Sequence, residues 1–256
     1  MSSGRSTVIE ELRTRLDCLE AERVGLRTTL PFGVAEIDDR LPGGGLLLGA
    51  LHEVSGGEGD MAYGAAAALF VAGVLARLSG PVLWCLMRPD LFAPALASVG
   101  LHPDRVIYVE AGDGRTVLLV MEEGLRIRGL AGVVGETDRL DLTASRRLQL
   151  AAERSGVVAF AVRRWRSRAA ADKAGHSAAV TRWRITAAAS VPLRTPGIGR
   201  ARWTLDLLRC RNGIPSTWIV EACDAEGRLA ASRVPRPADL VDRPAAAGAG
   251  RRLAAG

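Results

Sequence analysis

The sequence has few of the residues that build metal centres and disulfide frameworks. It has only three histidines, and no acid or cysteine lies at ligand or triad spacing from them. Its four cysteines are far apart and form no C-x-x-C pair: Cys18, Cys85, Cys210 and Cys223. We therefore expect neither a metal site nor a disulfide framework, which fits a reducing cytoplasm.

Long apolar segments are also missing. The longest run, residues 64–76, ends at Arg77 before it could cross a bilayer. The first residues carry Glu10 and Glu11 where a signal segment would be apolar. The sequence therefore predicts a soluble, cytoplasmic protein with no membrane partner.

Lysine is nearly absent, since Lys173 is the only one among 34 basic residues. The basic residues are unevenly placed. Twelve lie between residues 163 and 211, where only Asp172 and Asp206 are acidic, so this block has a charge of +10 while the whole chain has +6. Such an asymmetry predicts one face that meets phosphate or an acidic partner.

Apolar periodicity predicts an α/β fold. Short apolar runs typical of buried strands alternate with segments of helical spacing, which indicates a RecA-like, mainly parallel sheet covered by helices. The expected strands are 46–54, 82–87, 105–110, 130–135 and 157–162, and the expected helices are 62–78, 91–99, 115–128 and 143–154. A β-hairpin region should follow, with its turn at residues 211–213.

The chain is expected to have three parts. Residues 1–28 form an amphipathic N-terminal helix with one apolar stripe, made of Ile9, Leu12, Leu16 and Leu19. Residues 29–234 form the core, and residues 235–256 are rich in Pro, Ala, Gly and Arg, which predicts a disordered tail. The apolar stripe can dock on a partner or neighbouring subunit, or fold back on its own core, and the sequence leaves both open.

A glycine-rich loop, EVSGGEGDMAYG, lies where a phosphate-binding loop would be expected. Such a loop needs G-x-x-x-x-G-K-[ST], in which backbone N–H groups cradle the phosphates, lysine neutralises charge and a hydroxyl holds Mg²⁺. Counted from Gly56, the last three positions are Met61, Ala62 and Tyr63. We therefore expect a degenerate loop, kept as a fold element without a nucleotide cofactor, whose glycines are Gly56, Gly57 and Gly59.

The stretch LPFGVAEIDDRLPGGGLLLGALHEVSGGEG, with the order of strands and helices after it, resembles a RecA-type core. The resemblance places the catalytic glutamate of RecA-type ATPases at Arg88, and their metal-associated acid at Glu136. It also implies two DNA-binding loops. The first is missing here, because ETDRLDLTASRR leads almost directly into the next helix, and the second would follow Val162.

Over about residues 30–223 the chain is more specifically similar to the ImuA family, RecA-like proteins encoded in bacterial SOS mutagenesis cassettes beside the polymerase-like ImuB. The stretches that carry this resemblance are GGGLLLGALHEV, GVVGE, TRWR and TPGIGRARWTLDLLRCRNG…TWIVEAC. It implies a non-catalytic accessory role in error-prone translesion synthesis after DNA damage. The implied partners are an ImuB-like Y-family polymerase homologue, RecA or its filament, and an alternative replicative-type DNA polymerase, with single-stranded DNA as a further candidate.

The basic block is the candidate surface for DNA or a partner, because each arginine can neutralise a phosphate and tryptophan can stack on unpaired bases. The stretch around Trp165 is the favoured part, since it reads as a loop. Trp183, Trp203 and Trp218 can equally be interior aromatics of alternating strands. The candidate residues are Arg163, Arg164, Trp165, Arg166, Arg168, Lys173, Arg182, Arg184, Arg200 and Arg202.

Two other functions stay compatible with these residues. A SulA-like inhibitor of cell division would share a RecA-like core without nucleotide chemistry, and would not need the basic block. A DNA-dependent ATPase of the RecA family would need a lysine from outside the loop.

Overall fold

The computed structural model describes residues 28–57, 60–165, 175–190 and 199–232. Several predictions lie outside these residues and stay predictions. They concern the N-terminal helix with Ile9, Leu12, Leu16 and Leu19, the tail from residue 235, and the site residues Gly59, Arg166, Arg168 and Lys173.

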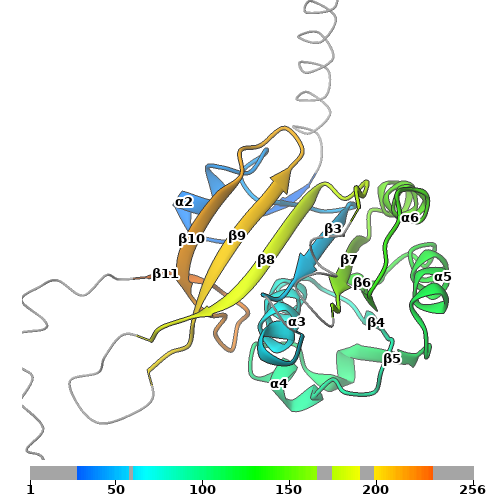
Figure 1. Cartoon of the computed structure of the whole chain (residues 1–256), viewed down its shortest axis with the longest axis horizontal. Coiled ribbons are helices and arrows are strands. Elements are labelled where there is room, and N and C mark those ends of the chain that lie inside the picture. The colour runs from blue at the N-terminus through cyan, green and yellow to red at the C-terminus, as the bar shows by residue number, and fades with distance from the viewer. Residues whose placement is uncertain (1–27, 58–59, 166–174, 191–198, 233–256) are drawn as a thin grey trace, which may run out of the picture.

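The described residues form a large mixed sheet and a small antiparallel pair, β1 (Thr29–Leu30) with β2 (Leu46–Leu47). The large sheet comprises β3 (Leu51–Ser55), β4 (Val82–Leu86), β5 (Val106–Glu110), β6 (Gly132–Thr137), β7 (Val158–Arg163), β8 (Thr181–Ala188), β9 (Arg202–Cys210), β10 (Ser216–Glu221) and β11 (Ala230–Ala231). Its order is β11-β10-β9-β8-β3-β7-β6-β4-β5 (Figure 1). The strands from β8 to β5 are parallel, and β9, β10 and β11 are antiparallel to their neighbours.

Helices cover both faces of the parallel part (Figure 1). One face carries α3 (Asp60–Ala76) and α4 (Ala93–Ala97), and the other carries α5 (Gly114–Gly124) and α6 (Leu142–Ser155). The short α2 (Ala35–Asp38) lies before β2, and a 3-10 turn (Pro103–Arg105) precedes β5. The predicted α/β class is confirmed, and the arrangement is consistent with a RecA-like core. None of the helices within the described ranges is both long and apolar enough to cross a membrane.

Local sequence signals explain where α5 and α6 begin and end. The Asp113 carboxylate accepts hydrogen bonds from the backbone N–H groups of Arg115 and Thr116, and Asp141 caps α6 by accepting from Ala144 N–H. Helix α6 ends at Gly156, whose φ of +79° suits glycine. Both helices therefore begin at the edge of the sheet where the parallel strands end.

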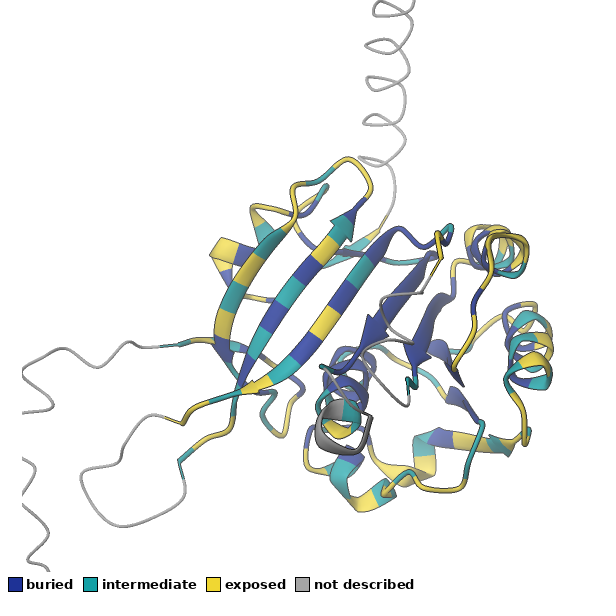
Figure 2. Cartoon of the chain, in the orientation of Figure 1, coloured by how far each residue is buried: buried dark blue, intermediate teal, exposed yellow. Residues whose placement is uncertain are grey.

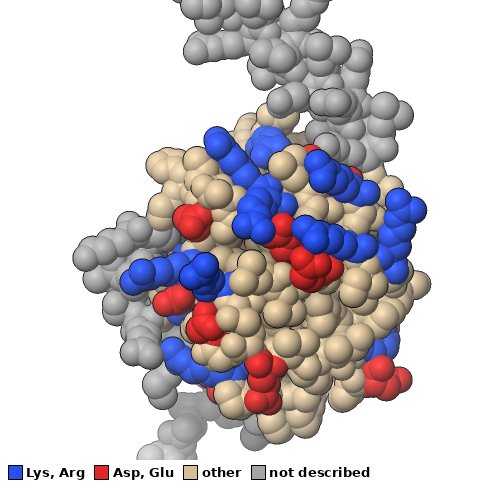
Figure 3. All heavy atoms as spheres, turned by 90° about the vertical axis from the view of Figure 1, so that its right-hand side faces the viewer, with Lys and Arg blue, Asp and Glu red and all other residues tan. Residues whose placement is uncertain are grey.

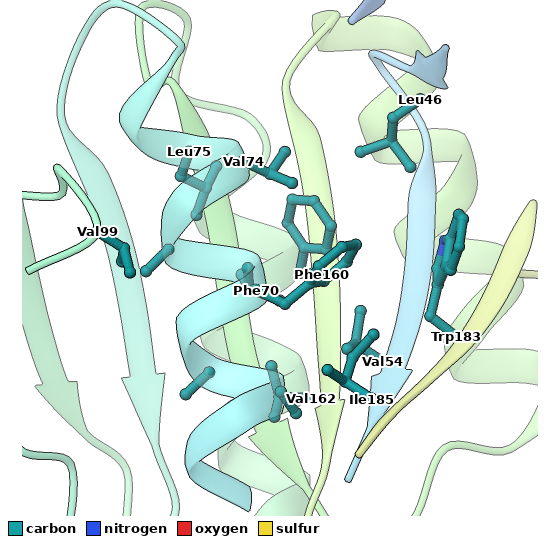
Figure 4. Close-up of a cluster of buried hydrophobic side chains, with 14 of the residues drawn as sticks. Leu46, Val54, Phe70, Val74, Leu75, Val99, Phe160, Val162, Trp183 and Ile185 are labelled. Carbon is teal, nitrogen blue, oxygen red and sulfur yellow. The ribbon is translucent and has the colours of Figure 1, made fainter. Parts of the chain in front are cut away.

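The main core lies between α3 and the sheet. Phe70 of α3 packs against Trp183 of β8, with ring centroids 5.8 Å apart, and Figure 4 shows Phe160 and Val54 beside them. Trp203 is also buried. Figure 2 shows more buried and less buried residues alternating along β8, β9 and β10, as expected for strands with one covered face.

This packing settles the two interpretations of the later tryptophans. Trp183 and Trp203 are interior residues. The half-buried Trp218 has its ring centroid 6.2 Å from that of Trp183, and its indole N–H donates to the carbonyl of Glu36. The interior interpretation is confirmed for Trp183 and Trp203, while Trp218 is a half-buried hairpin residue that packs against the core.

Several sequence boundaries were wrong, including the end of the expected helix 115–128, since α5 ends at Gly124. The expected strand 46–54 is split into β2 and β3, because Gly49 has a φ of +61°. A Cβ at Gly49 would come within 3.1 Å of Gly156, so the tight turn also lets this segment approach the end of α6. The expected loop after Val162 begins later than predicted, because β7 continues to Arg163.

Two other predictions are confirmed. β9 and β10 form the antiparallel hairpin, with Asn212 at a φ of +60° in its turn. Residues 138–141 are all that separates β6 from α6, so this region has no space for the first loop of RecA-type proteins.

A buried hydrogen-bond chain joins β2, β3 and β8. His52 Nε2 lies 2.8 Å from the carbonyl oxygen of Leu47, and a carbonyl only accepts, so Nε2 carries the proton. Nδ1 then accepts from the hydroxyl of Thr181 at 2.7 Å, and Thr181 Oγ1 accepts from the indole N–H of Trp183 at 2.8 Å. Because every polar atom in the chain has a partner, the neutral imidazole can stay fully buried.

This arrangement predicts a stability loss in acid. Burial lowers the pKa of His52 from 6.5 to about 4. As the pH falls below the pKa of His52 in the unfolded chain, the unfolded chain binds a proton that the folded chain does not. The free energy of unfolding therefore falls by about 2–3 kcal/mol by about pH 4.5. Urea unfolding at about pH 7.5 and about pH 4.5 measures the loss. The His52→Gln variant should lose less stability over that interval, and an equal loss in both proteins would contradict the assignment.

Candidate functional site

A buried carboxylate lies at the centre of the polar cluster on the α6 side of β3. Glu53 is 1% exposed, and its Oε1 accepts from Arg163 Nη1 at 3.1 Å. Its Oε2 accepts from Arg182 Nε at 2.9 Å and from the hydroxyl of Ser177 at 2.7 Å. The parallel register explains the contact, because Glu53 pairs directly with Arg182 of β8, and Arg163 lies one pleat further along β7. One carboxylate thus holds two guanidinium groups.

Arg163 is the most constrained of these basic groups. Its Nη2 donates to the carbonyl of Asp138 at 3.0 Å, and its guanidinium carbon lies 5.2 Å from the ring centroid of the half-buried Trp165. Burial lowers the pKa of Arg163, while Glu53 opposes that shift. The side chain is therefore held inside the protein.

A second ionic cluster lies on the α3 side of the sheet. Glu136, at the end of β6, is buried and accepts from the indole N–H of Trp84 at 3.1 Å and from Arg164 Nη1. Arg164 also makes two hydrogen bonds to the carboxylate of Asp90, at 3.1 and 2.8 Å. Burial raises the pKa of Glu136, and the charge of Arg164 opposes this.

A hollow of about 290 Å³ adjoins this cluster, between α3 and α4. Arg88, Asp90, Glu136 and Arg164 supply its charged lining. Phosphoryl transfer needs cationic groups free to neutralise phosphate and a carboxylate free to act on the nucleophile. Arg164 already holds both carboxylates here.

The described residues show no other arrangement typical of a reactive centre. Within them, the His, Cys, Asp and Glu side chains form no group of three or more that could hold a metal ion. Burial raises the pKa of Cys85 and Cys223 to about 12 and that of Cys210 to about 11. These three thiols therefore stay protonated at neutral pH and are poor nucleophiles.

Comparison with known proteins gives the family of the chain. No family model matches it. Two curated proteins, each named Protein ImuA, from Caulobacter vibrioides strains NA1000 and ATCC 19089, are 40% identical to it over 246 residues, which covers 90% of this chain and 98% of each relative. The chain belongs to the ImuA family.

In this ImuA-family chain, the predicted contact arginines are mostly engaged internally. Five of the six that the structure describes form ion pairs: Arg163 with Glu53, Arg164 with Glu136 and Asp90, Arg182 with Glu53, Arg184 with Asp206, and Arg200 with Glu221 and Asp224. The sixth, Arg202, donates to the carbonyl of Ala189 at 3.1 Å. The expectation that Arg163 belongs to an open loop is wrong, because it is a buried strand residue.

The loop glycines Gly56 and Gly57 come directly after β3, and Gly56 is buried. Arg184 and Arg200 are exposed, and the indole N–H of Trp165 finds no acceptor within the described residues. The structure thus brings Arg163 and Arg182 to Glu53, with Trp165 beside Arg163. Arg184 lies on β8, Arg202 begins β9, and Arg200 lies just before β9.

The carboxylate partners were missed by the sequence interpretation. Glu53 lies in an apolar strand that is covered on both faces, and a charged residue at such a position needs a buried counterion. That signal was available in LHEVS. Asp90 offered no comparable signal, because only the folded chain brings it beside Arg164.

Replacing Glu53 with Gln should destabilise the protein strongly. The variant removes the carboxylate charge between Arg163 and Arg182, so a buried guanidinium loses its counterion, which costs about 3–5 kcal/mol. Urea unfolding at neutral pH measures this loss. The matched control is Glu123→Gln on exposed α5, where the ion pair with Arg126 contributes little. Equal stability of the two variants would show that Glu53 does not hold the cluster together.

Proposed function

We propose that the protein is a non-catalytic accessory factor of error-prone translesion synthesis in the SOS response, and that it bridges an ImuB-like polymerase homologue and RecA or its filament. Membership of the ImuA family supports the first part. The observation that carries the proposal is a glycine loop without lysine beside a sheet edge whose arginines are already bound by carboxylates.

Three features argue against nucleotide hydrolysis. The loop has Ala62 where phosphate binding needs lysine, and Tyr63 where Mg²⁺ binding needs Ser or Thr. Arg88 stands at the position of the catalytic glutamate. The remaining acid, Glu136, is held by Arg164 and Trp84. Each feature removes a different requirement of phosphoryl transfer, so together they favour a binding role.

A RecA-like body without nucleotide chemistry can act as an adaptor. It can present a face compatible with a RecA filament without needing ATP for assembly, and so cap or remodel the filament while a second surface holds the polymerase homologue. An alternative replicative-type DNA polymerase would be a further partner of the same assembly.

Single-stranded DNA is a proposed partner of the basic block. Arg163, Arg164 and Arg182 serve the ionic clusters, so changing them would alter the fold as well as any contact. Arg166, Arg168 and Lys173, which lie outside the described residues, are the candidates chosen to test the DNA contact. Arg184 on β8, Arg202 at the start of β9 and Arg200 just before it are the other candidate contacts.

Affinity capture of the tagged protein from DNA-damaged cells tests the adaptor. We expect recovery of a Y-family-like polymerase homologue and RecA with and without nuclease treatment, because an adaptor contacts both proteins directly. Recovery only with intact DNA would indicate a DNA-binding protein instead, and recovery of the tubulin-like division protein alone would indicate a division inhibitor. Tight ATP binding with DNA-stimulated hydrolysis by the purified protein would contradict a non-catalytic role.

The DNA contact has its own test. Replacing Arg166, Arg168 and Lys173 with Ala should weaken binding of a labelled oligothymidylate and reduce the slope of log K against log salt by about 2, since each lost phosphate contact removes about 0.7. The melting temperature should not change. The control variant replaces Arg115, Arg126 and Arg128, three exposed arginines outside the block. Equal losses in both variants would mean that overall charge, and not the block, attracts DNA.

A further inference from the structure

A groove runs between α5 and α6 on the face that Figure 3 turns toward the viewer. Two adjoining hollows of about 340 and 450 Å³ make up this α5–α6 groove, and both are lined by Glu122 of α5 and Arg147 of α6. The groove lies outside the basic block, and it adjoins the Glu53 cluster only at Asp138, whose carbonyl accepts from Arg163.

Leucines from both helices are exposed in the α5–α6 groove. Leu119 of α5 is 49% exposed and Leu150 of α6 is 51% exposed, while Val117 and Leu148 on the inner sides of the same helices are buried. The half-buried Leu118 lines the groove as well. Leu119 lines the larger hollow and Leu150 the smaller one, and exposed leucines in two adjoining hollows are typical of a surface that receives other apolar side chains.

Arginines surround these leucines. Figure 3 shows Lys and Arg side chains gathered over this face, with acidic side chains among them. The lining comprises six arginines and three acids: Arg115, Arg126, Arg128, Arg139, Arg147 and Arg154, with Glu122, Asp138 and Asp141. The lining of the groove therefore has a net charge of +3.

Glu122 fixes the geometry of two of these arginines. Its side chain is mostly buried, and it forms ion pairs with Arg126 on its own helix, at 3.3 Å, and with Arg147 across the groove. Since one carboxylate is shared by two guanidinium groups, each arginine keeps N–H donors for a further acceptor. Arg126 and Arg147 are both exposed.

We propose that the α5–α6 groove binds an amphipathic helix of a partner protein, with leucine-like side chains on one stripe and Asp or Glu beside it. An amphipathic helix laid in a groove between two helices can bury an apolar stripe against Leu119 and Leu150. Its flanking carboxylates then meet the arginines on the walls. This inference rests on the described surface alone and does not depend on the proposed function.

Nucleic acid fits this groove less well. The lining contains no aromatic residue on which a base could stack, and Glu122, Asp138 and Asp141 would repel phosphates. The leucines would also gain little from a sugar–phosphate backbone. The amino-terminal segment of this chain is a weaker match as well, because residues 7–27 carry five acids and four arginines and so offer little net charge.

The test is a display selection of helical peptides against the full-length protein, with counter-selection against a Leu119→Glu/Leu150→Glu variant. We expect enrichment of peptides that carry Leu at i, i+3 or i+4 and i+7 with Asp or Glu on the flanks. A selected peptide should bind the Leu150→Glu variant at least about tenfold more weakly by fluorescence anisotropy, since a buried carboxylate would face both leucines and acids. The matched control is Ile219→Glu, since Ile219 is 50% exposed on β10.

Several outcomes would overturn the proposal. One is enrichment of basic or aromatic peptides, and another is equal binding to the Leu150→Glu and Ile219→Glu variants. Displacement of the peptide by oligothymidylate would make the groove a nucleic-acid site. If replacing Leu12 and Leu16 with Glu in the full chain raised the affinity for the peptide tenfold, the amino-terminal segment would compete with the peptide. The protein's own segment would then be the occupant of the groove. Equal melting temperatures of Leu150→Glu and Ile219→Glu exclude unfolding as the cause of lost binding.

Discussion

The buried charge of Glu53 is the constraint on which much of this structure depends. A carboxylate in a strand covered on both faces costs several kcal/mol unless it is paired and hydrogen-bonded. Arg163, Arg182 and Ser177 satisfy it, and they come from β7, from β8 and from the segment that leads into β8. The order of the central strands and this cluster support each other, because only a sheet with β3 between β7 and β8 brings these groups together.

This pairing changes what the basic block can do. A run of arginines in a sequence suggests a surface for phosphate, yet the arginines nearest the sheet edge neutralise internal carboxylates on both faces of the sheet. A guanidinium already bound to a carboxylate in a buried site would have to leave that partner before it could bind DNA, and so it contributes little free energy to DNA binding. Charge counted along the chain therefore overstates the charge available at the surface, and contact surfaces should be sought among exposed arginines, including those of α5 and α6.

The sequence predicted the parts of the fold that depend on local patterns. Continuous apolar runs gave the parallel strands, alternation gave the hairpin, and the same alternation placed Trp183 and Trp203 inside. The prediction from sequence failed where contacts between distant segments determine the structure. Gly49 breaks one apolar run because that turn must approach Gly156, and Arg163 stays in its strand because Glu53 lies beside it. The α5–α6 groove could not be predicted from the sequence for a related reason. Its arginines are spread among acids along the chain and come together only when the two helices pack.

The proposed loss of nucleotide chemistry also has a consequence for regulation. A RecA-type ATPase changes state because a bound nucleotide has different affinities for two conformations, and a ligand can shift an equilibrium only by that difference. In this chain arginines hold the carboxylates Glu53 and Glu136, and under the proposed non-catalytic role this part of the sheet would offer a nucleotide no contact that differs between two conformations. An adaptor built this way would engage its partners according to its concentration and its affinity for them. Synthesis induced by DNA damage would then be enough to control it, which is the behaviour that the proposed role in SOS mutagenesis requires.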